Sequence, residues 1–161
     1  YSGIHGAVGV DVSLDALEVA QNNKDINNVP YVELIQSDMF EALEGSGMKF
    51  DVIVSNPPYI PTRVIKGLDE EVRLHDPFIA LDGDEDGLKF YRIITDKARD
   101  YLNKDGYLCY EIGHDQAAKV SDILSSYGYN DIRVIKDLAG LDRVVVARYY
   151  GTSVRSGSYN I

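Results

Sequence analysis

Three polar residues, Asp11, Asp38 and Asn56, each end a short apolar stretch that we predict to be a strand. The intervals from 11 to 38 and from 38 to 56 are each about one strand–helix unit long. Ligands of open α/β sheets bind beyond the carboxyl ends of the strands. We therefore expect the two carboxylates and the amide to converge on one crevice.

Each of the two acids also has a structural alternative. The Asp11 carboxylate can accept both hydroxyls of a ribose, as in dinucleotide-binding folds, or it can start the next helix or stay solvated. Asp38 can accept a hydrogen bond from the exocyclic amine of an adenine, or it can cap a helix around Phe40–Leu43. The residue types leave these alternatives open.

The stretch "NPPY", residues 56–59, combines four residues with one chemical purpose. Asn56 precedes a proline and is therefore extended, while Pro57 and Pro58 have a fixed φ and no N–H. The Asn56 side-chain oxygen and the Pro57 carbonyl thus form a rigid pair of acceptors for a planar –NH₂ group. Tyr59 adds an aromatic face for stacking an amide or a base. The alternative, a structural turn, needs neither the asparagine nor the aromatic residue.

The elements that carry these residues predict an α/β fold, with a mostly parallel sheet and helices on both faces. The last two strands flank "LAGL" and predict an antiparallel hairpin at the edge. Residues 1–150 form one predicted catalytic domain, and 151–161 a flexible tail. After the first strand, which ends at Asp11, the predicted strands are 31–38, 50–56, 106–113, 131–137 and 142–150. The predicted helices are 13–25, 86–102 and 115–128. We expect Ser13 to cap the first of these helices and Asp115 the last.

Composition excludes several classes of protein. The 161 residues have 16 basic and 26 acidic side chains, a net charge of −10, which disfavours a stand-alone nucleic-acid binder. No run is long enough to span a membrane, and nothing reads as a signal peptide. The one cysteine, Cys109, suits a reducing compartment, and we expect a cytoplasmic protein. The scattered histidines have no cysteine partners, so we expect no metal site.

The motif "NPPY" resembles motif IV of the adenosylmethionine-dependent amino-methyltransferases. Together with "VGVDVSLDALEVAQNN", "IQSDMFEAL", "HDPFIALDGDEDGLKFYRII", "GYLCYEIGHDQ" and "DLAGLDRVVVAR", it resembles the release-factor glutamine methyltransferase family over residues 8–148. The resemblance implies a Rossmann-like class I methyltransferase fold and S-adenosylmethionine as cofactor. It also implies methyl transfer to the glutamine of a Gly-Gly-Gln loop in peptide chain release factors.

The resemblance also implies roles for individual residues. Asp11 matches the acid that binds the ribose, and Asp38 the acid beside the adenine. Met39 stands where relatives often place an aromatic residue against the adenine, which the neighbouring Phe40 offers instead. Asn56, Pro57, Pro58 and Tyr59 match the clamp that holds the substrate amide, with Asn56 also near the cofactor.

The chain departs from the family pattern at its start. The first strand and its loop of the form Asp-x-Gly-x-Gly-x-Gly are missing, as is the N-terminal helical domain that recognises the substrate. We expect the sequence to begin inside the catalytic domain, which would leave two strands with unpaired backbone groups. We therefore expect the 161 residues alone to be inactive and to bind adenosylmethionine very weakly.

Three further features have open interpretations. Glu111 ends a predicted strand and either faces the crevice or sits at its edge, and His75 belongs to a loop turn or to a lid. The acidic run "DGDEDG", 82–87, lacks the spacing of an EF-hand and predicts a solvated loop with a helix cap. Two other functions stay open: methylation of an exocyclic amine in DNA or RNA, and a non-catalytic nucleotide-binding module such as an NAD domain.

Overall fold

A computed structural model describes residues 6–65 and 78–151 of the chain. The chain divides into two compact units, Tyr1–Met48 and Lys49–Ile161, which we call the N-terminal unit and the C-terminal unit. The predicted single domain over 1–150 stays a prediction. His75 and residues 152–161 of the predicted tail lie outside the described residues.

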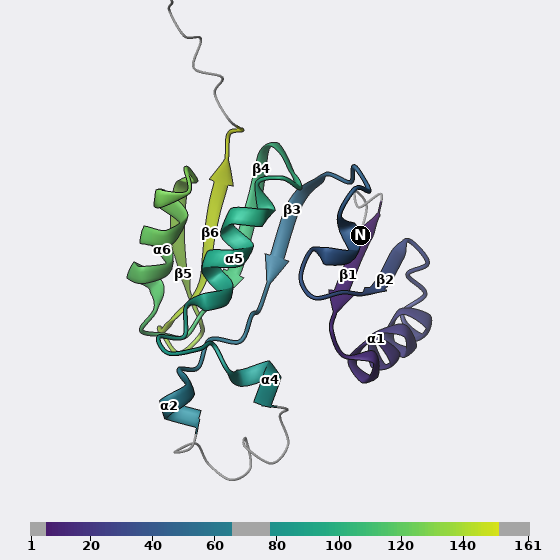
Figure 1. The fold of residues 1–161 in the computed structure, drawn as a ribbon, viewed down its shortest axis with the longest axis horizontal. Helices are drawn as coiled ribbons and strands as arrows, with labels where there is room; N and C mark the ends of the chain where they lie inside the picture. The colour runs from purple at the N-terminus through teal and green to yellow at the C-terminus, as the bar shows by residue number, and fades with distance from the viewer. Residues whose placement is uncertain (1–5, 66–77, 152–161) are drawn as a thin grey trace, which may run out of the picture. The chain divides into compact units, whose positions relative to one another are not determined.

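The N-terminal unit is a two-stranded parallel sheet with one helix (Figure 1). Strand β1 (Ala7–Asp11) pairs with β2 (Val32–Gln36) in a register that sets Asp11 opposite Gln36, so both strands end side by side. Helix α1 (Leu14–Ile26) lies between them in sequence, and a short 3-10 helix, η1 (Glu41–Leu43), follows β2. The Ser13 hydroxyl accepts a hydrogen bond from the Ala16 amide, which confirms the predicted cap.

The C-terminal unit contains a four-stranded sheet in the order β3-β4-β6-β5. Its elements are β3 (Phe50–Ser55), α2 (Thr62–Ile65), α4 (Phe78–Leu81), α5 (Lys89–Ala98), β4 (Leu102–Glu111), α6 (Ala117–Ser126), β5 (Asn130–Lys136) and β6 (Asp142–Tyr149). Strands β3 and β4 are parallel, while β6 is antiparallel to both β4 and β5. The predicted α/β class and the antiparallel hairpin at the C-terminal edge are therefore confirmed.

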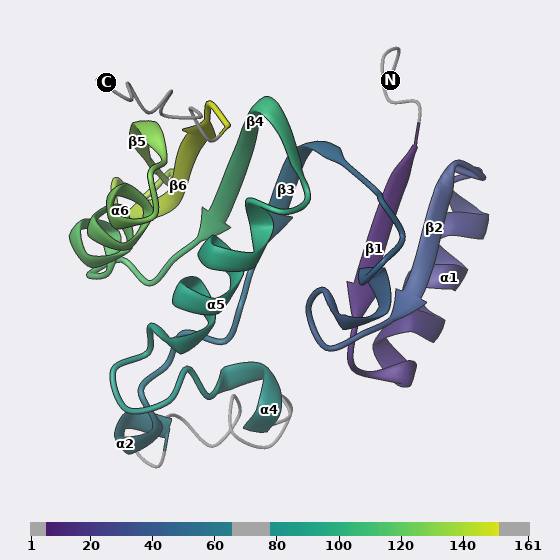
Figure 2. The ribbon, with the colours of Figure 1, turned by 45° about the horizontal axis from the view of Figure 1, so that its top comes forward.

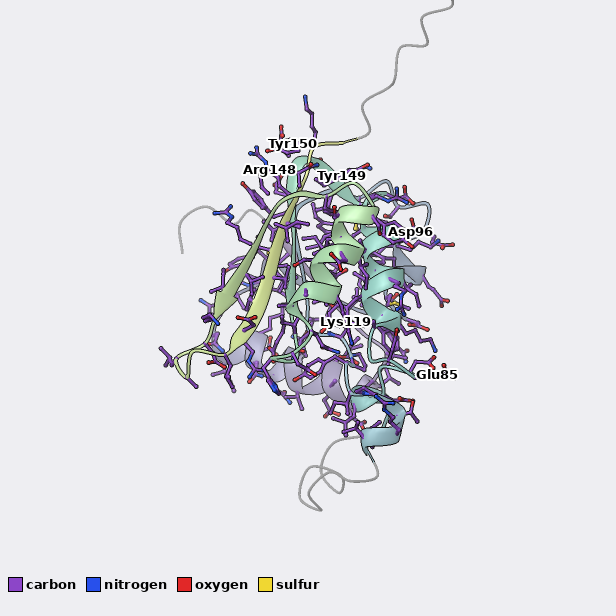
Figure 3. All side chains as sticks on the ribbon, turned by 90° about the vertical axis from the view of Figure 1, so that its left-hand side faces the viewer. Glu85, Asp96, Lys119, Arg148, Tyr149 and Tyr150 are labelled. Carbon is purple, nitrogen blue, oxygen red and sulfur yellow. The ribbon has the colours of Figure 1, made fainter. Side chains whose placement is uncertain are left out.

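Helices α5 and α6 lie side by side on one face of this sheet (Figures 1 and 3). Between helices and sheet is a core whose largest fully buried side chains are Tyr91, Tyr110, Leu108, Ile112, Leu124, Val120, Val145 and Thr95. Burial of this apolar surface is the main force that holds the unit together.

Three buried tyrosine hydroxyls have hydrogen-bond partners in the core. Tyr91 donates to the Glu111 carbonyl at 2.9 Å, the Tyr110 hydroxyl lies 2.9 Å from the Thr95 hydroxyl, and Tyr129 donates to the Thr95 carbonyl at 3.1 Å. Burial raises the pKa of all three tyrosines, because the phenolate would lose its hydration. The first two bonds join α5 to β4, and the third joins α5 to the residue before β5. Among the described residues, no buried side-chain nitrogen or oxygen lacks a hydrogen-bond partner.

Within the described residues, four strands have a strand partner on one side alone: β1 and β2 pair with each other, β3 pairs with β4, and β5 pairs with β6. The missing first strand between β1 and β3 stays a prediction. In the described part of the chain, no helix has the length and apolar character needed to cross a bilayer.

Candidate active site

The "NPPY" turn follows β3 at the carboxyl ends of two parallel strands. Ser55 pairs with Tyr110, so Asn56 leaves the sheet beside Glu111, the last residue of β4. Asn56 is exposed, Pro57 is buried, and Pro58 and Tyr59 are half-buried. This is the edge of a parallel pair where α/β folds bind their ligands.

Both acceptors of the turn are uncommitted. Among the described residues, the Asn56 side chain makes no hydrogen bond, and no group donates to the Pro57 carbonyl. A polar group that is not used by the protein is available to a ligand. The pair of acceptors and its role in binding an amide stay a prediction.

A second segment holds the residues that follow the turn. Ile60 and Asp82 form a parallel bridge, in which the Ile60 amide donates to the Leu81 carbonyl at 3.0 Å and the Gly83 amide to the Ile60 carbonyl at 2.9 Å. The Thr62 hydroxyl donates to the Asp82 carboxylate at 2.6 Å. Figure 2 shows α2 and α4 at the same end of the unit, where these segments meet.

The acidic run 82–87 is more than the solvated loop that its composition predicts. Its carboxylates are exposed or half-exposed: Asp84 pairs with Lys89 at 3.1 Å and Asp86 with Arg92. These hydrogen bonds from the two cations lower the pKa of each aspartate. Gly83 and Gly87, however, are buried against the Tyr59 backbone. The run is therefore one wall of the turn.

Helix α6 begins differently from the prediction. Asp115 does not cap it; Gln116 occupies the cap position and makes no cap hydrogen bond with its side chain. That side chain instead bonds the Tyr59 and Gly87 carbonyls and the Gly113 amide. Sequence reasoning missed Gln116, because its partners lie far away in the chain.

Glu111 and Tyr91 meet at the end of β4, next to the turn. Glu111 is half-buried, and its carbonyl accepts the Tyr91 hydroxyl. Burial raises the pKa of Tyr91, and the nearby Tyr59 and Glu111 raise it further. Tyr91 is therefore a neutral donor that fixes the end of β4.

In the N-terminal unit, Asp11 and Asp38 lie at adjoining strand ends. The Asp11 carbonyl accepts the Ser37 amide at 3.0 Å, which continues the pairing of β1 and β2 toward Asp38. One Asp11 carboxylate oxygen accepts the Ser13 amide at 2.8 Å, so this acid helps to start α1. Its other oxygen has no hydrogen-bond partner within the described residues.

Asp38 does not have the capping role offered as an alternative. Phe40 occupies the cap position of η1 without a side-chain cap hydrogen bond, while the Ser37 hydroxyl accepts the Ala42 amide at 3.0 Å. The Asp38 carboxylate is exposed and makes no hydrogen bond to the described residues. Met39 adopts a φ of 49°, which is uncommon for a residue with a side chain and turns the chain away after Asp38.

The convergence of the three polar groups stays a prediction, because Asp11 and Asp38 belong to the N-terminal unit and Asn56 to the C-terminal unit. The described residues contain no group of three or more histidine, cysteine, aspartate or glutamate side chains that could hold a metal ion.

Comparison with known proteins relates this site to methyltransferases. The family model "Methyltransferase small domain" matches residues 3–79. A "Release factor glutamine methyltransferase" of Agrobacterium fabrum is 46% identical over 142 residues, which cover 88% of this chain and 48% of that protein. A protein of the same name from Clostridium botulinum is 38% identical over 160 residues, 90% of this chain and 56% of that protein.

Over most of its length, this chain is similar to proteins named release factor glutamine methyltransferase. It spans about half the length of the curated relatives it matches. The residues predicted to bind the cofactor and to form the amide clamp, from Asp11 to Tyr59, lie within the range 3–79 that matches the family model.

Solved structures support the fold. A methyltransferase from Pyrococcus furiosus superposes with a TM-score of 0.63 at 21% identity, covering 91% of this chain and 64% of that one. The 16S rRNA N2 G1207 methyltransferase of T. thermophilus, solved with AdoMet and guanosine, superposes with a TM-score of 0.58 at 18% identity. The match covers 89% of this chain and 31% of that one. The chain thus has the class I methyltransferase fold that the resemblance implied.

Proposed function

We propose that this protein transfers a methyl group from S-adenosylmethionine to the side-chain amide nitrogen of a glutamine in peptide chain release factors. The observation that carries the proposal is the pair of uncommitted acceptors, the Asn56 side-chain oxygen and the Pro57 carbonyl, on a turn with fixed φ angles. The relatedness to release factor glutamine methyltransferases supports the choice of substrate.

The two acceptors match the chemistry of a primary amide. Its nitrogen is a poor nucleophile because the lone pair is delocalised into the carbonyl. Hydrogen bonds from both N–H groups to Asn56 and Pro57 favour rotation and partial pyramidalisation of that nitrogen and fix its direction. Such alignment can contribute on the order of 7–11 kcal/mol at best.

The acceptors also stabilise the positive charge that develops on the nitrogen. The methylated nitrogen is strongly acidic and loses its extra proton to water, so no side chain has to act as a base before transfer. Tyr59 offers the face on which the flat amide stacks.

The residues proposed to hold the cofactor are Asp11, Asp38 and Met39. When bound, S-adenosylmethionine supplies the methyl group on a sulfonium. The free oxygen of Asp11 and the carboxylate of Asp38, at adjoining ends of β1 and β2, fit two ribose hydroxyls and an adenine amine respectively. Met39 and the half-buried Phe40 offer apolar contact to the purine.

The test offers a release factor and DNA, side by side, as methyl-accepting substrates to the protein expressed from its complete gene. With radioactive methyl-labelled adenosylmethionine, we expect label on a release factor and none on DNA. Label on DNA alone would favour the alternative of an exocyclic-amine methyltransferase, whose –NH₂ group the same clamp fits. Calorimetric titration with adenosylmethionine and with NAD tests the third alternative, since binding of NAD alone would point to a nucleotide-binding module.

A further inference from the structure

One buried polar side chain, Gln116, joins three segments of the C-terminal unit. It is 6% exposed. Its Nε2 donates to the Tyr59 carbonyl at 3.0 Å and to the Gly87 carbonyl at 3.3 Å, while its Oε1 accepts the Gly113 amide at 3.0 Å. Both N–H groups and the oxygen of the Gln116 amide are therefore used in hydrogen bonds. If the amide were flipped, its oxygen would face two carbonyl oxygens, which cannot donate to it.

Two glycines also pack against the Tyr59 backbone. A Cβ atom on Gly87, whose φ is +72°, would lie 2.3 Å from the Tyr59 carbonyl oxygen, and one on Gly83 would lie 2.9 Å from the Tyr59 Cα. Contacts this short do not occur between real atoms, so only glycine allows the acidic run to approach this closely. Gln116 and the Gly83–Gly87 segment therefore both contact the Tyr59 backbone and also each other.

The contacts that hold Tyr59 also restrict the two acceptors, because Pro57 and Pro58 lie between Asn56 and Tyr59. The peptide plane that contains the Pro57 carbonyl is attached to Pro58, whose ring fixes φ. Once the backbone of Tyr59 is fixed, the ψ angle of Pro58 is the one soft dihedral between that backbone and the Pro57 carbonyl. Asn56 precedes two residues with fixed φ and is restricted in the same way.

We propose that Gln116 is a positioning residue for methyl transfer, which aims the Pro57 carbonyl and Asn56 by holding the Tyr59 carbonyl. The inference rests on the proposed function, since it assigns Gln116 to the clamp of that reaction. Gln116 acts from behind the turn, and its bonds lead to backbone groups alone.

Two substitutions separate this role from simple packing. Gln116→Glu keeps the size and the acceptor for Gly113 but turns a carboxylate toward two carbonyls. Gln116→Met keeps the volume and removes all three bonds. The matched control is Tyr129→Phe, which removes one buried bond to the Thr95 carbonyl. Tyr129 packs against Tyr149, which lies at the opposite end of the unit from Glu85 of the acidic run (Figure 3).

The experiment measures kcat, KM, cofactor affinity and hydrogen exchange on the protein expressed from its complete gene. We expect kcat with release factor to fall about 10- to 100-fold in both Gln116 variants, the loss expected when reacting groups are misplaced by about 1 Å. Cofactor affinity should stay within about twofold. The Ile60 and Gly83 amides, which hydrogen-bond across the two segments, should exchange faster, while the amides of β4 keep their protection.

The outcomes distinguish this inference from the proposed function. If the unmodified protein does not methylate release factor, the proposed function fails, and hydrogen exchange still tests the grip of Gln116 on the turn. If exchange at Ile60 and Gly83 does not change, or if Tyr129→Phe lowers kcat as much as the Gln116 variants, the positioning role is overturned.

Discussion

The two units differ in how much apolar surface they bury. In the C-terminal unit, both long helices contribute to a core that contains every fully buried large side chain of the described residues. In the N-terminal unit, α1 has no buried residue, and Leu43 is the buried apolar side chain of the described part. Large apolar side chains such as Leu14 and Ile26 are 64% and 80% exposed.

This difference in burial indicates which unit can hold its part of the site in a fixed geometry. A two-stranded sheet with one helix is too small to be stable by itself in water, whereas a four-stranded sheet covered by two helices has a core of its own. The acceptors proposed for the substrate lie on the unit with the core, so we expect their arrangement to be fixed before any ligand binds. The acids proposed for the cofactor lie on the unit that buries little.

The largest effect that we predict tests the acceptors on the well-packed unit. Asn56→Ala should lower methyl transfer by on the order of 100-fold or more, the loss typical of removing one preorganised group around a developing charge. Cofactor affinity should change little. Steady-state transfer assays and calorimetry measure both quantities, with the exposed Asn130→Ala as control. Near-normal turnover in Asn56→Ala would contradict the clamp.

The next prediction concerns the less buried unit. Asp11→Ala should weaken adenosylmethionine binding by roughly 1.5–3 kcal/mol, or about 10- to 150-fold, the range for hydrogen bonds to a charged group. Asp11→Asn should keep the bond to the Ser13 amide, and so separates the start of α1 from ribose binding. Calorimetry provides the dissociation constants. An unchanged value in Asp11→Ala would leave this acid with its structural role alone.

A smaller effect should come from the wall of the turn. Gly87→Ala and Gly128→Ala both place a side chain at positive φ, which costs about 1–2 kcal/mol. Only Gly87 also meets the Tyr59 carbonyl, because nothing lies within 4 Å of a Cβ on Gly128. We expect both variants to melt at lower temperature and only Gly87→Ala to lose transfer, by about 10-fold. Equal transfer rates in the two folded variants would show that the wall does not position the turn.

The smallest effect should be that of Tyr59→Phe. The Tyr59 hydroxyl makes no hydrogen bond to the described residues, and the substitution keeps the ring that we propose to stack on the amide. Transfer should stay within about two- to threefold, as for a substitution without a lost partner. A much larger loss in the assay would mean that the hydroxyl itself contacts the substrate.

Much of the fold follows from local patterns. The Ser13 cap, the strand that ends before Asn56 and the hairpin of β5 and β6 each depend on residues close together in the chain. The two acceptors of the turn could also be predicted, because proline fixes the backbone around them without help from other segments.

The remainder of the site depends on contacts between distant residues. The Gln116 side chain meets Tyr59 and Gly87, and no local pattern links these three positions. The acidic run looks like a solvated loop because its carboxylates are exposed, while the glycines that pack against the turn have no side chain to signal burial. The cap of α6 was assigned to Asp115 for a related reason: its type suits a cap, but the helix begins later.

The buried tyrosines also make the chain its own spectroscopic probe. It has 12 tyrosines and no tryptophan. In the described residues, the N-terminal unit has Tyr31 alone, while the C-terminal unit buries Tyr91, Tyr110, Tyr129 and Tyr149. Intrinsic fluorescence excited in the tyrosine band therefore follows the melting of one unit, whereas far-ultraviolet circular dichroism follows the helices and strands of both. If the melting midpoints from fluorescence and from circular dichroism coincide, the two units unfold together. If they differ, the fluorescence midpoint belongs to the C-terminal unit, and the other transition belongs to the N-terminal unit.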